Sequence, residues 1–387
     1  MSPFLAGLLL LPLATATDYA LGQEAEAQEA EEQEEETGFL ERRIGDNWVL
    51  SPLIAPISSP GRGFALAIGG LATFSTEPDG KELPRSTISL FVSAGADSSI
   101  GFDADMSSFW LDDRFRLELD LDYDDGSENY WGVGYELGRE IEKDEDVTEY
   151  QRVAYELPVI ASWRVGSSLF AGINFDLIKM EVDERSPTME SDPDFLAFGD
   201  EILSVGAGVQ LTFDSRDETG DAYSGRYFNA QGTWYRDSLG SDQDFEIFVL
   251  DYRQYQQVRR PGRTLAWQVL ARQAEGDVPW TRMSTVGSSH DLRGYTGGRF
   301  RSKAAAWALV EYRHMTNKEL WKLGRQGFAV WTGLGFIGRD FGDFSGHELP
   351  NFGVGYRLGL QPRRSLRLDL GWGYDEIGFY LNLTEAF

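Results

Sequence analysis

The 387-residue sequence contains no cysteine, only three histidines and far fewer basic than acidic residues. Without thiols the chain offers no zinc-thiolate or iron–sulfur ligand and no cysteine nucleophile, and the fold must be held without disulfides. The formal charge of −28 argues against nucleic acid as a partner, because phosphate binding requires a basic surface. We therefore predict no metal centre, no cofactor and no nucleic-acid partner.

Patterns typical of catalysis are also missing. Ser289-His290-Asp291 places triad residue types in a row, but neighbours in sequence rarely adopt triad geometry. The sequence has no G-x-S-x-G nucleophile elbow. Acidic runs such as 140–146 lack the spacing of a dedicated Ca²⁺ loop and indicate a hydrated surface instead. We expect no catalytic residues and predict that the protein is not an enzyme.

Long hydrophobic runs are absent beyond the first residues, since none approaches the roughly 20 apolar residues of a membrane helix. Residues 1–16 combine an uncharged apolar core with Ala14-Thr15-Ala16, which is typical of a signal peptide and its cleavage site. A short membrane anchor is the alternative. Residues 17–62, with a glutamate-rich run at 24–36, are expected to form an acidic periplasmic tail that leads to the first strand.

The body of the sequence alternates apolar and polar residues with period two. In 114–124, for example, Phe115 and Leu121 share one face, whereas Arg116 and Asp120 share the other. Strands of this length match the bilayer, and such alternation suits lipid outside and a wet lumen inside. We predict an all-β fold over 63–387, a 16-stranded antiparallel transmembrane barrel. A soluble β-sandwich is the alternative.

The predicted strands run from 63–76 to 378–387, and the fifth is 129–138. Alternate connections form a short set and a long set, which is the asymmetry expected of a barrel with periplasmic turns and longer outer loops. The short set comprises 124–128, 165–167, 259–262 and 361–364, and the long set includes 182–201 and 274–302.

Three stretches of the sequence resemble one family when taken in order. Residues 211–226 contain a D-x-R-D turn made by Asp214, Arg216 and Asp217. A loop motif, Leu292-Arg293-Gly294-Tyr295, precedes the strand segment 309–313, and 367–387 ends the chain with an R-x-D-x-G-x-G pattern. Together these stretches resemble the BamA/TamA-like outer-membrane assembly and translocator barrels, which are also called bacterial surface antigens.

This resemblance implies a barrel whose long sixth outer loop folds back into the lumen. It also implies that Arg293 pairs with an acidic residue of the inner wall, and Glu311 and Asp369 are the candidates. An ordinary solvated loop arginine is the alternative. The thirteenth predicted strand lacks the acidic residue of the family and contains Thr332 and Gly333 near that position, so the loop is held differently or more weakly.

Family members with assembly or secretion roles carry periplasmic POTRA modules before the barrel. Residues 17–62 are too few for such a module, so we expect the chain to lack it, which counts against client handling. At the other end, Phe379, Leu381, Leu383 and Phe387 are predicted to share the outward face of the last strand. They resemble the signal that barrel-insertion machinery reads during biogenesis.

Three functions remain open from the sequence. The first is assembly or translocation of a protein or lipid client at a weakly closed junction between the first and last strands. Glycines such as Gly69, Gly70 and Gly371 would weaken the side-chain packing at that junction. The second is a binding or structural barrel, with a homo-oligomer as one form of it. The third is a plugged diffusion pore. All three place the protein in the bacterial outer membrane, in contact with its lipid, with the N-terminal tail in the periplasm.

Overall fold

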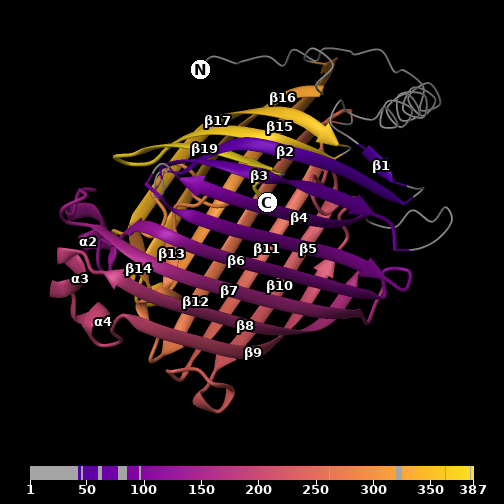
Figure 1. Cartoon of the computed structure of the whole chain (residues 1–387). Helices are drawn as coiled ribbons and strands as arrows, with labels where there is room; N and C mark the ends of the chain where they lie inside the picture. Colours follow the sequence, from indigo (N-terminus) through magenta and orange to yellow (C-terminus); the bar gives the residue numbers. More distant parts are fainter. Residues whose placement is uncertain are drawn as a thin grey trace, which may run out of the picture.

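The computed structural model describes residues 42–44, 47–59, 63–76, 85–95, 97–260, 262–319, 325–361, 363–383 and 385–387. The predicted signal peptide and most of the acidic tail lie outside these residues. Sixteen long strands form one antiparallel sheet, and each strand pairs with its neighbour in the chain from β2 to β19. The sheet curves round so that β19 lies beside β2 (Figure 1).

The sixteen strands have the following bounds: β2 (Trp48–Ser59), β3 (Gly63–Phe74), β4 (Ser86–Gly95), β5 (Ile100–Trp110), β6 (Phe115–Asn129), β7 (Glu149–Arg164), β8 (Leu169–Glu184), β9 (Glu201–Asp214), β10 (Gly225–Tyr235), β11 (Phe245–Gln257), β12 (Arg263–Gly276), β15 (Ala304–Glu319), β16 (Arg325–Gly338), β17 (Glu348–Gln361), β18 (Arg364–Trp372) and β19 (Ile377–Leu383). The shorter elements are β1 (Arg42–Ile44), β13 (Ser284–Val286), β14 (Phe300–Ser302), α2 (Tyr135–Glu140), α3 (Pro187–Ser191), α4 (Pro193–Leu196), η1 (Asp237–Leu239), η2 (Trp280–Arg282) and η3 (Phe341–Asp343). Within the described residues, no helix is long and apolar enough to cross a bilayer.

The alternation predicted for the strands sorts side chains between an inner and an outer face. Arg116 of β6 reaches across the interior to Asp214 of β9, with 2.7 Å between Nη1 and Oδ2. Leu121 of the same strand lies on the opposite, solvent-accessible face. Large apolar side chains are exposed around the outer face, and they include Ile54, Leu66, Ile68, Leu90, Val92, Ile173, Val209, Leu250, Val269, Val310, Val330, Phe352, Val354 and Phe379. An apolar exterior around a polar interior is the pattern expected of a barrel in lipid.

Two strand predictions were wrong. One strand was missed and one was predicted where none exists, so the predicted total of sixteen is still correct. The first long strand of the sheet is β2, which begins at Trp48, inside the segment predicted to be tail, and not at residue 63. The strand was not predicted because it contains Pro52 and Pro56. Proline cannot donate to a β-ladder and is normally confined to edge strands. The expected boundary between tail and barrel at 62/63 is therefore displaced by one strand.

The second wrong prediction is the strand at 129–138. The residues of the expected turn at 124–128 continue β6, and the chain then leaves the sheet for a loop that contains α2. Gly132 and Gly134 have φ angles of 88° and 121°, a left-handed backbone that breaks a strand although the sequence still alternates. The predicted connections 165–167 and 259–262 do fall between strands, and 361–364 spans the turn from the last residue of β17 to the first residue of β18.

The long connections gather at one end of the sheet, which we call the helix end. Because strands alternate in direction, the connections 130–148, 185–200 and 277–303 share this end, and Figure 1 shows α2, α3 and α4 there. The connection 277–303 lies between the eleventh and twelfth of the sixteen strands, β12 and β15, and contains the small hairpin β13–β14. Tyr130, Phe195 and Trp280 come from three of these connections and pack together in a buried cluster.

Candidate functional site

The interior of the sheet is occupied by the loop 277–303, whose tip is the motif Leu292-Arg293-Gly294-Tyr295. Three of these side chains, Leu292, Arg293 and Tyr295, are at most 1% exposed. Tyr295 Oη donates to Pro350 O at 2.7 Å, and the Gly294 amide donates to Tyr380 Oη at 2.9 Å. The tip is therefore bonded to β17 and β19 and does not lie free in solvent.

Arg293 contacts both carboxylates that the sequence offered as alternatives. Its Nη1 lies 2.6 Å from Asp369 Oδ2, and its Nη2 donates to Glu311 Oε2. All three side chains are fully buried. A planar guanidinium presents its donors in a fixed fork, so one arginine can join β15 to β18 in this way. The alternative of a solvated loop arginine is excluded by this burial.

The thirteenth strand, β16, supplies an aromatic ring where the family resemblance implied an acid. The Arg293 guanidinium lies over the ring of Trp331, 3.6 Å from its centroid. Thr332 and Gly333 are the residues that sequence reasoning placed near this position, and Trp331 was missed. In a desolvated place a cation–π contact contributes about 2 kcal/mol. The arginine is thus held by two carboxylates and one indole.

Further arginines extend this cluster toward the end of the chain. Arg357 of β17 donates to Asp369 Oδ1 at 2.5 Å and to Glu385 Oε1 at 2.9 Å, and Arg313 of β15 donates to Glu311 Oε1 at 2.8 Å. Asp221 Oδ1 lies 4.0 Å from Arg313 Nη1. We call the whole group the interior ion network, and it comprises Asp221, Arg293, Glu311, Arg313, Arg357, Arg367, Asp369 and Glu385.

The interior ion network joins all the stretches on which the family resemblance rested. Asp221 comes from 211–226, Arg293 from the loop motif, Glu311 and Arg313 from 309–313, and the remaining acids from 367–387. Four guanidinium groups face four carboxylates, so the buried charges balance formally. Balance matters because an unpaired charge in a dry interior costs several kcal/mol. Arg357 belongs to none of the quoted stretches and was missed.

Glycines of the wall make room for the loop backbone. A Cβ on Gly371 of β18 would lie 2.5 Å from Arg293 O, and a Cβ on Gly335 of β16 would lie 2.1 Å from Leu292 Cδ1. Gly294 itself has a φ of 119° and lies against the backbone of Trp372. Gly371, which the sequence analysis assigned to the weakly closed junction, therefore serves the close approach of loop and wall.

The D-x-R-D residues organise a separate corner at the end opposite to the helix end. Asp214 Oδ1 accepts from Arg216 Nε at 2.9 Å, and Asp214 Oδ2 accepts from Arg116 of β6. Asp217 Oδ1 accepts from the amide of Tyr223 at 3.0 Å and so closes the 215–224 loop. Beside this corner the interior keeps a cavity of about 330 Å³, lined in part by Arg116, Asp214 and Arg216.

The last residues of the chain depart from their predicted orientation. Phe379 is 49% exposed on the outer face, whereas Leu381, which lies on the same side of β19 by alternation, is only 9% exposed; the side chain of Leu383 lies outside the described residues. Phe387, by contrast, turns inward and lies in the same buried cluster as Tyr255, and Arg313 Nη2 donates to its carbonyl at 2.9 Å. The prediction that Phe387 lies on the outward face was wrong, because the chain bends inward after β19.

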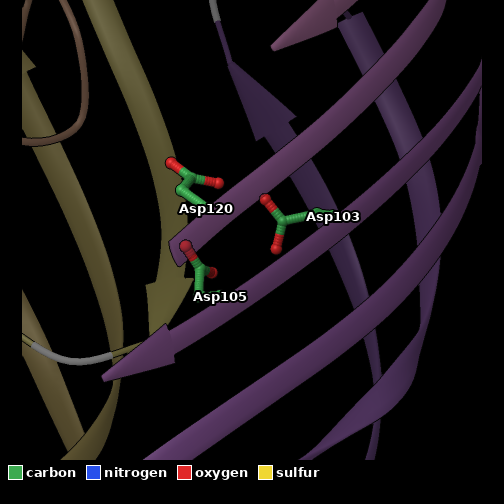
Figure 2. A group of neighbouring side chains, drawn as sticks. All are labelled: Asp103, Asp105 and Asp120. Atoms are coloured by element: carbon green, nitrogen blue, oxygen red, sulfur yellow. The ribbon is translucent and has the colours of Figure 1, made fainter. Parts of the chain in front are cut away.

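A block of like charge lies on another part of the inner wall. Asp103 and Asp105 of β5 face Asp122 and Asp120 of β6 in the strand register. Figure 2 shows Asp103, Asp105 and Asp120 converging, and carboxylate oxygens of these three lie within 4.8 Å of one another. Oxygen ligands at this spacing are those that Ca²⁺ uses, but like charges opposite each other also occur without an ion. Sequence reasoning placed no metal here, because the pairing of β5 with β6 was needed to find the group.

The fold is similar to those of solved BamA and CdiB outer-membrane barrels. BamA from Haemophilus ducreyi lacking POTRA domains 1–3 matches with a TM-score of 0.53 at 14% identity, over 94% of this chain and 77% of that chain. CdiB from Escherichia coli matches with a TM-score of 0.57 at 11% identity, over 89% and 63% of the two chains. CdiB from Acinetobacter baumannii matches with a TM-score of 0.50 at 10% identity, over 87% and 60%.

The chain therefore spans less than two thirds of either CdiB chain. No sequence family and no curated protein matches it. At these identities the likeness is one of fold, and it confirms the BamA-like barrel that the three sequence stretches predicted.

If Trp331 helps to hold Arg293, replacing it by leucine weakens the attachment of the loop and leaves the charges of the interior ion network unchanged. We expect Trp331→Leu to lower the free energy of unfolding by about 2–3 kcal/mol, from the lost cation–π contact and the lost packing. Urea unfolding in detergent micelles, followed by migration of the folded barrel on unheated gels, measures it. Trp163→Leu is the matched control, because Trp163 is 48% exposed on the outer face. An equal effect of the two substitutions would contradict the assignment.

Proposed function

We propose that this chain is a closed bacterial outer-membrane barrel that handles a protein client at the junction between β2 and β19. The helix end with its covered mouth faces outward, and the N-terminal tail lies in the periplasm. The role is non-enzymatic. The fold shared with BamA and CdiB supports the setting, and the edge of β2 that faces β19 is the observation that carries the client role.

The direction of the backbone groups of β2 follows from one hydrogen bond. The Ser75 amide donates to Asn47 O at 3.2 Å, and the register of β2 with β3 continues unbroken from that pair. In an antiparallel ladder the N–H and C=O groups of successive residues point to opposite edges. Odd-numbered residues of β2 therefore face β3, and even-numbered residues face β19.

Both prolines of β2 are even-numbered and so lie on the edge that faces β19. Proline has no N–H, so Pro52 and Pro56 remove two of the donors that the last strand needs. The last strand is also short, with 7 residues against 12 in β2. A junction with few backbone bonds opens at lower cost than the other junctions of the sheet. Such an edge is a template on which a strand of another protein can pair.

Reversible disulfide crosslinking of this junction tests the proposal. Because the sequence contains no native cysteine, only the introduced pair can form a disulfide. Ile54 and Phe379 lie on the outer face of β2 and β19, so cysteines at both positions form a candidate lock. The control is Ile68→Cys with Val92→Cys, a directly paired and exposed couple on β3 and β4. The assay measures insertion of a urea-unfolded eight-stranded barrel into liposomes that contain the protein.

We expect oxidation of the β2–β19 pair to slow insertion several-fold, reductant to restore it, and the β3–β4 pair to have no effect. Full crosslinking of β2 to β19 without any change in insertion would contradict a client role. That result would favour the second function, a binding or structural barrel, and analytical ultracentrifugation would then test for a homo-oligomer. If the 54–379 pair fails to crosslink, the pair 54–381 is tested next, because Leu381 lies two residues further along on the same side of β19 as Phe379.

A further inference from the structure

The short strand β1 lies on the same edge of β2 as β19. Arg42, Arg43 and Ile44 of β1 pair with Leu50, Val49 and Trp48 of β2. Those same β2 residues also pair with residues 72–74 of β3. A strand has two edges only, so β1 occupies the edge turned toward β19.

The two strands meet this edge at the same end of β2. Neighbouring strands are antiparallel, so β19 ends where β2 begins, and that is where β1 lies. The chain does not continue β19 along the edge. Instead Arg357 in the interior donates to Glu385, and Phe387 lies in the same buried cluster as Tyr255. β1 therefore takes the place beside β2 that a longer last strand would fill.

The even-numbered positions of β2 can now be assigned one by one. Trp48 and Leu50 face β1, and Pro52 and Pro56 have no N–H. Ile54 and Ser58 are the remaining even-numbered positions of the strand that carry a donor toward β19. A strand arriving from a client would find only these two donors unless β1 moved away.

We propose that β1 is a built-in occupant of the client edge, which an incoming strand must displace to pair with Trp48 and Leu50. The inference rests on the proposed function and names its regulation. A three-residue strand is easily displaced, because a two-stranded hairpin of this size is at best marginally stable by itself. A long client strand that displaces β1 can bond to positions 48 and 50 of β2 as well as to positions 54 and 58. A short or weakly pairing segment does not gain enough bonds to displace β1, so β1 excludes it.

The experiment uses the full chain in liposomes and a defined probe, a biotinylated peptide with the sequence of residues 378–387. A photocrosslinking amino acid stands at position 50, beside β1, or at position 54, beyond it. Three states are compared: native β1, β1 disrupted by Ile44→Pro, and β1 locked by oxidised Arg43→Cys with Val49→Cys. Arg43 and Val49 are direct partners in the register, and the reduced form of the locked variant is its own control.

We expect capture at position 54 in the native and disrupted states. Capture at position 50 should be weak in the native state, several-fold stronger after Ile44→Pro, and absent in the locked state until reductant is added. Equal capture at position 50 in all three states would overturn the inference and leave the proposed function standing, because the edge would accept a strand regardless of β1. No capture at either position in any state would overturn the proposed function and this inference with it. The locked variant needs no proline, so it decides the question even if Ile44→Pro fails to fold.

Discussion

Arg293→Ala is expected to lower the free energy of unfolding by about 3–5 kcal/mol, the cost of removing one partner from a buried ion pair. Glu311 and Asp369 are fully buried and would keep Arg313 and Arg357 as partners, yet four carboxylates would face three guanidinium groups. The indole of Trp331 would lose its cation as well. Urea unfolding in detergent micelles, followed by tryptophan fluorescence, measures the change.

Two further variants separate this effect from a general loss of charge. Arg339 lies on another connection with its side chain 84% exposed, and Asp343 is its ion-pair partner, so Arg339→Ala should change stability by no more than about 0.5 kcal/mol. Arg293→Lys keeps the charge but cannot reach two carboxylates with a planar fork, and an intermediate loss is expected. Equal stability of Arg293→Ala and Arg339→Ala would show that the loop is not anchored by this arginine.

The same variant tests the role of the loop as a plug. If Arg293 holds the loop in the interior, Arg293→Ala should raise the conductance of the protein in planar bilayers. The mouth at the helix end stays covered by the cluster around Trp280, so the increase should be intermittent rather than permanent. A large conductance of the native protein that Arg293→Ala leaves unchanged would favour the diffusion pore and dismiss the plug.

The strands were predictable from sequence wherever alternation is the dominant pattern. In 115–124 of β6 and 366–370 of β18 charged and apolar residues alternate without interruption, and the faces assigned to Arg116 and Asp369 are those observed. The pattern fails where backbone chemistry overrides it. Proline hides the first strand, β2, and glycines with positive φ end β6 although the residues that follow still alternate. The alternation of apolar and polar residues shows which face of a strand a side chain lies on. It does not show that a backbone N–H donor is missing or that the backbone is left-handed.

The site was predictable in part for the same physical reason. Alternation puts Glu311 and Asp369 on the inner face, and the family resemblance brought Arg293 to them. Alternation does not say which inner residues contact each other, because that depends on how strands far apart in the chain are placed. Trp331 and Arg357 are on inner faces too, yet only the folded sheet shows that one stacks on Arg293 and the other bonds to Asp369 and Glu385. The inward turn of Phe387 has no signal in the alternation at all.

That inward turn makes Glu385 a structural residue of the interior ion network. Its carboxylate accepts from Arg357 Nε at 2.9 Å and lies 3.5 Å from Arg313 Nε, with only 2% of the side chain exposed. Removing it leaves two buried guanidinium groups short of a partner, a situation that costs about 3–5 kcal/mol. We therefore expect Glu385→Ala to destabilise the folded barrel about as much as Arg293→Ala does.

Glu275→Ala is the matched control, because Glu275 is an exposed glutamate of β12, and its effect should stay within about 0.5 kcal/mol. Urea unfolding of purified, already folded protein is the measurement, since it separates stability from recognition of the chain end during insertion. A normal unfolding curve with a reduced amount of folded protein in the membrane would mean that the chain end acts during insertion only. A shifted curve would mean that the inward turn of the last residues closes the network that holds the loop.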